Sequence, residues 1–399
     1  MKRLFPLQPY VTFNIIRGLS LGVFAPIWVA YLHGQGRSLL ELGLLGVIFE
    51  VTKLIFEVPA GGLADKRGEQ WALTASALIG ASAFVLFLLT KEFALAALLM
   101  MLWATSEAIV SGAYEAWVTK SVGSDDVAKT LMACTRLLVG AVVVGGISGG
   151  LLYLVWPGIP FLLAAMLMIL NGFLVRQAQF PRHHDTPGVT PPSVWSIMLA
   201  GSRLLRAEIS MLRVVAAGFF VSLAYDAVAR FWQLELTIRG FSEVWFGVVF
   251  AGAGGIALLI LSAGIRWHHV INQQPFLALA MVDLLGIGLC LCLVAGSEIL
   301  ALMAISLLLV MEDLRDPIVH SLLASRLDTE HKATVFSLYS GIGAAGEIVS
   351  GAVFGLIAQH FGLAVTFLAV GLCLLPAVGF LLRNLMIEAP PPTASIGEL

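Results

Sequence analysis

Fifteen charged side chains lie in the interior of long apolar segments of this sequence. A charge at the depth of a lipid bilayer is costly unless it is paired or faces water, so such residues mark ion, proton or substrate pathways. A carboxyl group that is removed from water also binds a proton more readily, which allows it to take up and release protons under a gradient. The residues are Arg17, Glu50, Lys53, Glu57, Glu107, Glu115, Arg136, Asp226, Arg230, Asp283, Glu312, Asp313, Arg315, Asp316 and Glu347.

The acids are spaced so that several share a helix face. Glu107 and Glu115 are eight residues apart with Ser111 between them, and Glu312 and Asp316 are four apart. Such stripes fit proton coupling, and the alternative is that every acid is locked in a salt bridge. We expect proton-coupling roles for Glu115, Glu107, Glu312, Asp316 and Glu57.

Other charges have partners at helical spacing. Glu50 and Lys53 are three residues apart, and Asp226 and Arg230 are four apart, so each pair is able to neutralise itself on one helix face. A structural and a functional role are both open for these pairs. Arg136 and Glu115 lie at similar depths in consecutive helices, and we expect a buried bridge between them.

These charges must be positioned by membrane-spanning helices. Hydrophobic residues make up 59% of the 399 residues, charged residues make up 12%, and the mean hydropathy is +0.94. Apolar runs of about 20 residues span a bilayer as helices, because every backbone group must be satisfied internally. The twelve predicted spans are 9–33, 39–64, 71–91, 94–119, 129–155, 158–177, 210–236, 243–266, 275–296, 298–324, 333–359 and 361–383.

The chain divides into two halves. One long polar segment separates six spans from six, so we predict a bundle over 1–177, a cytoplasmic linker over 178–208, a second bundle over 209–385 and a tail over 386–399. With both termini in the cytoplasm, the inner segments carry fourteen Lys and Arg residues and the outer loops carry three. Each half also repeats a polar loop, a cation and a glycine-rich helix, as expected of two parallel repeats with a substrate between them.

The segment between the second and third spans carries a family motif. It runs Gly61-Gly62-Leu63-Ala64-Asp65-Lys66-Arg67-Gly68 and closely resembles the signature of the major facilitator superfamily. The resemblance implies a carrier in which the substrate lies between two bundles. Two further patches, Ser111 to Trp117 and Glu57 to Gly61, look most like the branch that contains bacterial drug:proton antiporters. Gly145 to Gly150 is similar to the antiporter glycine motif, but Gly146 replaces the usual proline, and helix packing alone would explain the glycines.

The motif departs from the family pattern in the signs of two charges. Glu69 follows the second glycine, where a basic residue is usual, and Lys120 stands near the end of the fourth span, where an acid is usual. We predict that the two side chains form a charge-reversed latch. The residues assigned to the latch motif are Gly61, Asp65, Lys66, Arg67, Gly68, Glu69 and Lys120.

The resemblance also implies that spans 1, 4, 7 and 10 line the central cavity, and polar residues occur on all four. Aromatic residues among them favour a lipophilic, cationic substrate. The residues expected to line the cavity are Asn14, Arg17, Trp28, Trp103, Ser111, Tyr225, Asp226, Arg230 and Asp313.

Other classes of protein lack support in the sequence. No nucleophile, nucleotide-binding loop or metal-ligand spacing is present, so we predict neither an enzyme nor a cofactor or metal site, and no nucleic-acid partner. We expect a monomeric, all-α, proton-coupled exporter of amphipathic small molecules in the bacterial inner membrane. Two alternatives stay open: a metabolite or lipid carrier that works by exchange or facilitated diffusion, and a non-transporting receptor or assembly factor.

Overall fold

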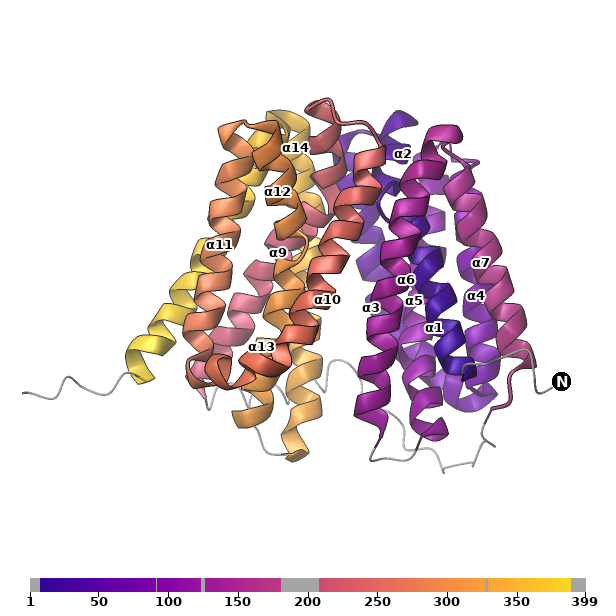
Figure 1. The fold of residues 1–399 in the computed structure, drawn as a ribbon, viewed down its shortest axis with the longest axis horizontal. Helices are drawn as coiled ribbons and strands as arrows, with labels where there is room; N and C mark the ends of the chain where they lie inside the picture. The colour runs from indigo at the N-terminus through magenta and orange to yellow at the C-terminus, as the bar shows by residue number, and fades with distance from the viewer. Residues whose placement is uncertain (1–7, 91, 123–125, 181–207, 327–328, 389–399) are drawn as a thin grey trace, which may run out of the picture.

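The computed structural model describes residues 8–90, 92–122, 126–180, 208–326 and 329–388, and these residues form α-helices without any β-strand. The helices form two groups that follow the order of the chain (Figure 1). The first group is α1 (Pro9–Phe24), α2 (Trp28–Gly34), α3 (Leu39–Arg67), α4 (Glu69–Phe87), α5 (Phe93–Ser121), α6 (Val127–Val155) and α7 (Ile159–Gln177). The second group is α9 (Ile209–Ile238), α10 (Val244–Gln273), α11 (Pro275–Ala295), α12 (Glu298–Leu308), α13 (Met311–Arg326) and α14 (Thr329–Glu388).

Eight segments in the described part are long and apolar enough to cross a membrane, judged by length and composition alone. One of them, Thr334–Ile387, has 54 residues, and Gly362 interrupts its helix with φ 81° and ψ 171°. α3 and the α12–α13 pair are not among the eight, and both α3 and α13 carry several charged residues. The count of twelve spans, the domain boundaries and the cytoplasmic termini therefore stay predictions. Most of the predicted linker, residues 181–207, lies outside the described residues.

The first predicted span is broken into two helices. Pro26, which has no backbone N–H, lies between α1 and α2. The side-chain amide of Gln233 in α9 donates to the carbonyl of Ala25 at 3.2 Å and accepts from the N–H of Ala30 at 3.1 Å. Gln233 is 1% exposed. It thus satisfies backbone groups on both sides of the break from the opposite helix group, which meets the requirement that buried polar groups have partners.

The two helix groups approach each other through glycines. A Cβ atom on Gly43 of α3 would lie 2.1 Å from the carbonyl oxygen of Gly351 in α14, and one on Gly247 of α10 would lie 2.4 Å from that of Gly146 in α6. No side chain fits at such distances, so the backbones themselves are in contact. The contacts lie in the first half of α3 and of α10 and in the second half of α6. We call this end of the molecule, which also carries α2, the closed end.

The paired glycines of α6 face two different neighbours. Cβ atoms on Gly145 and Gly149 would lie 2.6 Å and 2.1 Å from backbone carbonyl oxygens of α1. Gly146 and Gly150 instead face Gly247 of α10. Successive residues point about 100° apart around a helix, so each doublet supplies one glycine to its own group and one to the other. Packing of α6 on both sides accounts for this glycine motif.

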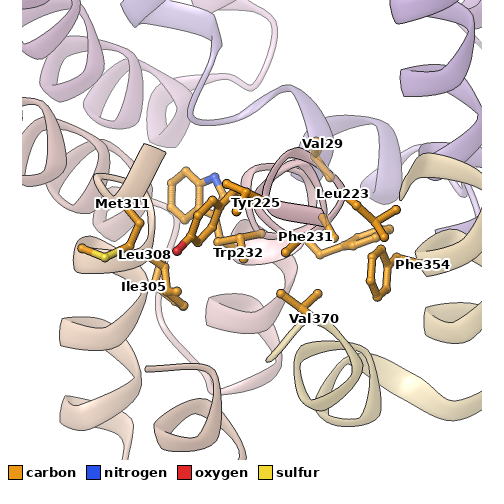
Figure 2. Packing of buried hydrophobic residues seen from close by; sticks show 14 of the residues in the cluster. Val29, Leu223, Tyr225, Phe231, Trp232, Ile305, Leu308, Met311, Phe354 and Val370 are labelled. Atoms are coloured by element: carbon orange, nitrogen blue, oxygen red, sulfur yellow. The ribbon is translucent and has the colours of Figure 1, made fainter. Parts of the chain in front are cut away.

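α9 is enclosed by other helices, with eighteen of its 30 residues buried. Figure 2 shows Tyr225 and Trp232 of α9 beside Leu308 and Met311, with Phe354 on the other side of the helix. A charged residue on α9 must therefore find its partner inside the protein.

Candidate functional site

Arg230 lies where the two helix groups meet. Its Nη2 atom forms an ion pair with Oδ1 of Asp226 at 2.5 Å, one turn earlier on α9, and only 6% of its side chain is exposed. A Cβ atom on Gly46 of α3 would lie 1.2 Å from Nη1 of Arg230. The glycine thus gives the guanidinium room against the first group. The pair expected from the sequence spacing is present, and its role in substrate binding stays a prediction.

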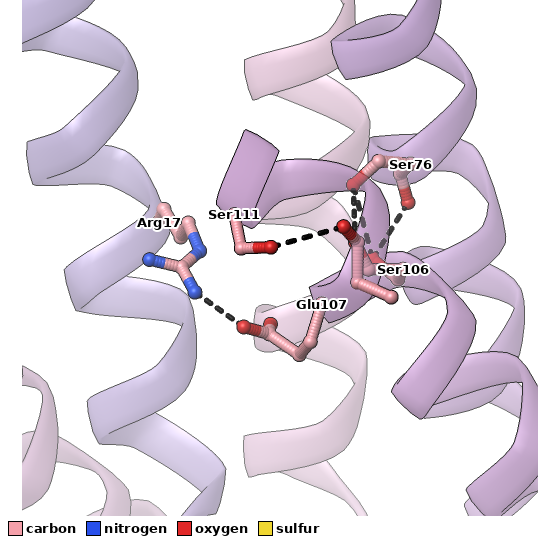
Figure 3. Close-up of polar contacts among 6 residues, drawn as sticks. Arg17, Ser76, Ser106, Glu107 and Ser111 are labelled. Carbon is pink, nitrogen blue, oxygen red and sulfur yellow. Dashed lines mark hydrogen bonds and ion pairs between the residues drawn. The ribbon is translucent and has the colours of Figure 1, made fainter. Parts of the chain in front are cut away.

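The first group has its own internal ion pair, between Arg17 of α1 and Glu107 of α5 (Figure 3). Neither side chain is more than 18% exposed. Glu107 is held in place by the contact between α4 and α5, where the hydroxyl of Ser76 donates to the carbonyl of Ser106 at 3.1 Å and that of Ser106 donates to the carbonyl of Ser76 at 2.9 Å. The polar residues of α5 thus have two roles: Ser106 packs α5 on α4, and Glu107 pairs with Arg17.

Lys53 of α3 links several of the charges. Its Nζ atom lies 3.9 Å from Oε2 of Glu50, one turn earlier. It also interacts electrostatically with Glu347 of α14, Glu107 of α5 and Glu57. The pair that the spacing predicted is therefore present, but it is loose, and Lys53 lies within the field of acids from three helices.

The charges of α13 point in two directions. Glu312 and Asp313 are exposed in the absence of lipid, and Asp316 is partly exposed. Arg315 points into the second group instead, where its Nε lies 3.1 Å from Oδ1 of Asp283 in α11 and its Nη1 donates to the hydroxyl of Tyr339 at 3.3 Å. Arg315 and Asp283 are both completely buried. This pair joins α13 to α11, and it fixes the helix face that presents the three acids.

Two predicted cavity residues are buried in helix contacts. Asn14 is 4% exposed and donates to the carbonyl of Cys134 in α6 at 2.7 Å, so it packs α1 on α6. Tyr225 is 3% exposed, and its hydroxyl lies against Gly286 in the interior of the second group. A polar stripe on a helix also forms where a neighbouring helix needs a hydrogen bond, and a cavity role for these two residues stays a prediction.

The predicted bridge between Glu115 and Arg136 is absent from the described part of the structure. Both side chains are exposed, and the ion pairs observed there include neither of them. Glu57 is also exposed. Proton-coupling roles for Glu115 and Glu57 stay predictions, and neither residue belongs to an ion pair in the described part. Ser111 is exposed as well, and its hydroxyl donates to the carbonyl of Ala108 at 3.1 Å within α5.

The predicted tryptophans form an aromatic cluster in the first group. The ring of Trp103 lies 6.1 Å from Trp28, 4.9 Å from Phe24 and 4.6 Å from Phe49, measured between centroids. The Nε1 atom of Trp103 is buried and has no hydrogen-bond partner among the described residues. Trp28 and Trp103 are therefore close together, and their contact with a substrate stays a prediction.

The predicted charge-reversed pair is present at the start of α4 and the end of α5. Lys120 forms an ion pair with Glu69, which is 5% exposed. Arg67 lies over the ring of Trp71, with 4.6 Å between its guanidinium carbon and the ring centroid. Gly61 and the side chain of Asp65 lie outside what the structure describes in this motif. The ion pair joins α4 to α5 within one group, and its action as a latch stays a prediction.

Gln233 was not singled out by sequence reasoning. Pro26 gives a signal that backbone groups near it need partners, but nothing in the sequence shows that residue 233 supplies them.

The comparison with protein families agrees with this geometry. Residues 11–314 match the family model of the Major Facilitator Superfamily, which is more than half of the chain. The chain belongs to the Major Facilitator Superfamily. It is therefore a multi-pass membrane transporter of small molecules, and the prediction that it is not an enzyme is confirmed.

Single proteins of known sequence or structure also resemble the chain. An uncharacterized MFS-type transporter of Bacillus subtilis (strain 168), YxaM, is 35% identical over 372 residues, which is 92% of each chain. The crystal structure of the nucleoside transporter NupG matches with a TM-score of 0.78 at 9% identity, over 95% of this chain and 99% of that one. A bacterial homologue of the human lysosomal transporter Spinster, in an inward-facing, unoccupied conformation, matches with a TM-score of 0.74 at 15% identity, over 96% of this chain and 97% of that one. At such identities the solved structures show a shared fold alone.

Proposed function

We propose that this transporter exports amphipathic, cationic small molecules from the bacterial cytoplasm in exchange for protons, by alternating access between two bundles of six helices. The bundles are those expected from the sequence, and the carrier works as a monomer with both termini in the cytoplasm. The drug:proton antiporter branch that the motifs resemble belongs to this proposal.

The observation that carries the proposal is the surplus of acids around the junction of the two groups. Ion pairs give each of three cations one acid: Arg17 to Glu107, Arg230 to Asp226 and Lys53 to Glu50. Four further acids on α13 and α14 have no ion-pair partner among the described residues, and a surplus of negative charge favours protons and organic cations over anions. These acids are Glu312, Asp313, Asp316 and Glu347.

The closed end supports alternating access. The positive-inside count places this end outside, since α2, the start of α3 and the start of α10 all adjoin the loops that are poor in Lys and Arg. The glycine contacts and Gln233 join the groups at this end. With this orientation the carrier is sealed on the outside, and transport requires that these contacts separate.

Reconstitution tests the proposal. The protein is placed in liposomes with an imposed pH gradient and offered a panel of labelled amphipathic cations, neutral metabolites and anions. We expect flux of a cation that depends on the gradient, and we expect Glu312→Gln to reduce it at least about tenfold if that acid binds the coupling proton. Glu298→Gln, at an exposed acid in the first turn of α12, is the matched control and should transport normally.

Each alternative has its own result in this assay. Flux of a metabolite or lipid that is unchanged by the pH gradient and by acid-to-amide substitutions would show a facilitated carrier or exchanger. Absence of flux for every compound, in liposomes that contain folded protein, would favour a receptor or assembly factor.

A further inference from the structure

The register of α3 on α14 follows from their glycine contacts. A Cβ atom on Gly43 would meet the carbonyl of Gly351 and lie 3.0 Å from the Cα of Gly355, whereas Val47, one turn later on α3, contacts Gly351. The two helices are therefore antiparallel, because moving forward along α3 moves backward along α14. We call the line of glycine contacts between α3 and α14 the glycine seam. One further turn along α3 brings Glu50 opposite Glu347, at the end of the seam that lies farther from the closed end.

This register brings the carboxyl groups of Glu50 and Glu347 within reach of a hydrogen bond between their side chains. Ionised carboxylates are acceptors only, so this bond exists only when one of the two groups carries a proton. If both carboxyl groups were ionised, they would repel each other strongly, because little water is present to screen their charges. The contact is therefore a proton-binding arrangement contributed by both helix groups.

The charges around this pair balance when it holds a single proton. Lys53 of α3 lies 3.9 Å from Glu50, and Asp226 and Arg230 of α9 form an ion pair beside them. Glu347 also interacts with Asp226, and with Glu312 of α13 at the edge of the cluster. Without Glu312, three acids (Glu50, Asp226, Glu347) face two cations (Lys53, Arg230), which leaves one negative charge, and one bound proton neutralises it.

Burial of the neighbouring arginine shows that water has little access here. Arg230 is 6% exposed, its guanidinium lies against Gly46, and its Nε atom is buried without a hydrogen-bond partner among the described residues. A buried cation is stabilised by acids beside it, and any net charge that stays unpaired in such a place has a high desolvation cost. The glycine seam at Gly43 and Gly351 covers the cluster toward the closed end.

We propose that Glu50 and Glu347 share one proton that holds α3 against α14, and that loss of this proton opens the closed end. Neither residue is among the proton-coupling acids expected from the sequence. The proposal rests on the proposed function only for the direction of the proton flow.

The proton takes a defined route through the transport cycle. With the closed end open, the two acids lie apart and one takes a proton from the outside. The groups then close, because the protonated acid donates to the other carboxylate. A cationic substrate that arrives from the cytoplasm favours release of the proton to the inside, after which repulsion between two carboxylates separates α3 from α14. One proton enters for each substrate that leaves.

A distance measurement across the closed end tests the proposal without substrate. Spin labels are placed on Gln35→Cys and His360→Cys, both exposed at this end, in a background without native cysteines. We expect the wild type in liposomes to lose most of its short-distance population between about pH 5 and about pH 9, as the shared proton dissociates. Glu50→Gln and Glu347→Gln should stay in the short-distance state throughout, because an amide donates without a proton.

The control and the second variant make the outcome decisive. Glu298→Gln, an exposed acid away from the seam, should follow the wild type. The double variant Glu50→Gln/Glu347→Gln, whose amides pair with each other, serves if a single variant is unstable, and it should also stay short at every pH. A wild-type distance that ignores pH, or glutamine variants that open as the wild type does, overturns the proposal.

Flux measured in the same liposomes separates this proposal from the proposed function. Closure that depends on pH in the wild type and no longer depends on pH in the glutamine variants, without proton-driven flux, would support the shared proton and reject proton-coupled export. Proton-driven flux with closure that ignores pH would retain export and reject this pair.

Discussion

Replacing Gln233 by leucine removes the hydrogen bonds that join α9 to the break between α1 and α2. Gln233 donates to Ala25 at 3.2 Å and accepts from Ala30 at 3.1 Å, and no other described side chain bonds to these two backbone groups. Both bonds cross between the helix groups, so both are lost when the closed end opens. Leucine has about the same volume as glutamine. In the closed state it leaves the carbonyl of Ala25 and the N–H of Ala30 without a partner, whereas in the open state neither group bonds to residue 233 in any case.

The size of the effect follows from the number of bonds. Side-chain hydrogen bonds inside membrane proteins contribute about 0.6 kcal/mol on average and about 1.7 kcal/mol at most. Two of them amount to about 1 to 3 kcal/mol, which changes the ratio of closed to open molecules by about 5- to 150-fold toward the open form.

The spin-label distance across the closed end measures this ratio. Gln233→Leu should show a larger open population than the wild type at the same pH, and Gln274→Leu, at an exposed glutamine before α11, is the control and should not. Closed and open populations equal to those of the wild type in Gln233→Leu would refute the reasoning that these bonds hold the groups together. A variant that is destabilised as a whole would be recognised by a lower melting temperature at every pH without a change in distance.

Three further predictions concern packing and charge. Arg315→Met leaves a buried acid without its partner, so it should lower the free energy of unfolding by about 3 to 5 kcal/mol, seen as a lower melting temperature in detergent; an unchanged melting temperature would contradict a structural role. Gly43→Ala places a Cβ atom 2.1 Å from a carbonyl oxygen of α14 and should shift the protein toward the open form, whereas Gly62→Ala on the same helix, where nothing lies within 4 Å, should not; equal distances in both variants would show that the seam is not what closes. Lys120→Glu should impair transport, and adding Glu69→Lys should restore it through a reversed ion pair; an additive loss would exclude the pair as a latch.

Local spacing predicted the contacts that lie on one helix. Asp226 and Arg230, and Glu50 and Lys53, are pairs because residues three or four apart share a face, which holds in any helix. The pair of Glu69 and Lys120 was also predicted, because the family motif supplied the register between two helices. The helical class and the glycine-rich packing helix likewise needed composition and pattern alone.

Contacts between helices far apart in the sequence were harder to predict. Periodicity showed that Asn14 and Tyr225 lie on polar stripes, but not whether the stripe faces a cavity or a neighbouring helix. Glu115 and Arg136 have matching depths, yet depth does not determine the rotation of each helix about its axis. The meeting of Glu50 with Glu347 depends on the register of α3 on α14, which the glycines determine and which no local pattern contains.

The distribution of ion pairs explains how two such charged bundles are able to separate. Each of the nine ion pairs observed in the described part joins residues of the same helix group, from Arg17 with Glu107 in the first to Arg315 with Asp283 in the second. Pulling an ion pair apart away from water costs far more than breaking a neutral hydrogen bond. The contacts that cross between the groups are instead glycine backbones, the side-chain amides of Gln233 and Gln359, and the carboxyl pair of Glu50 and Glu347. Opening therefore leaves the paired cations neutralised, and in our proposal it is controlled by a single proton.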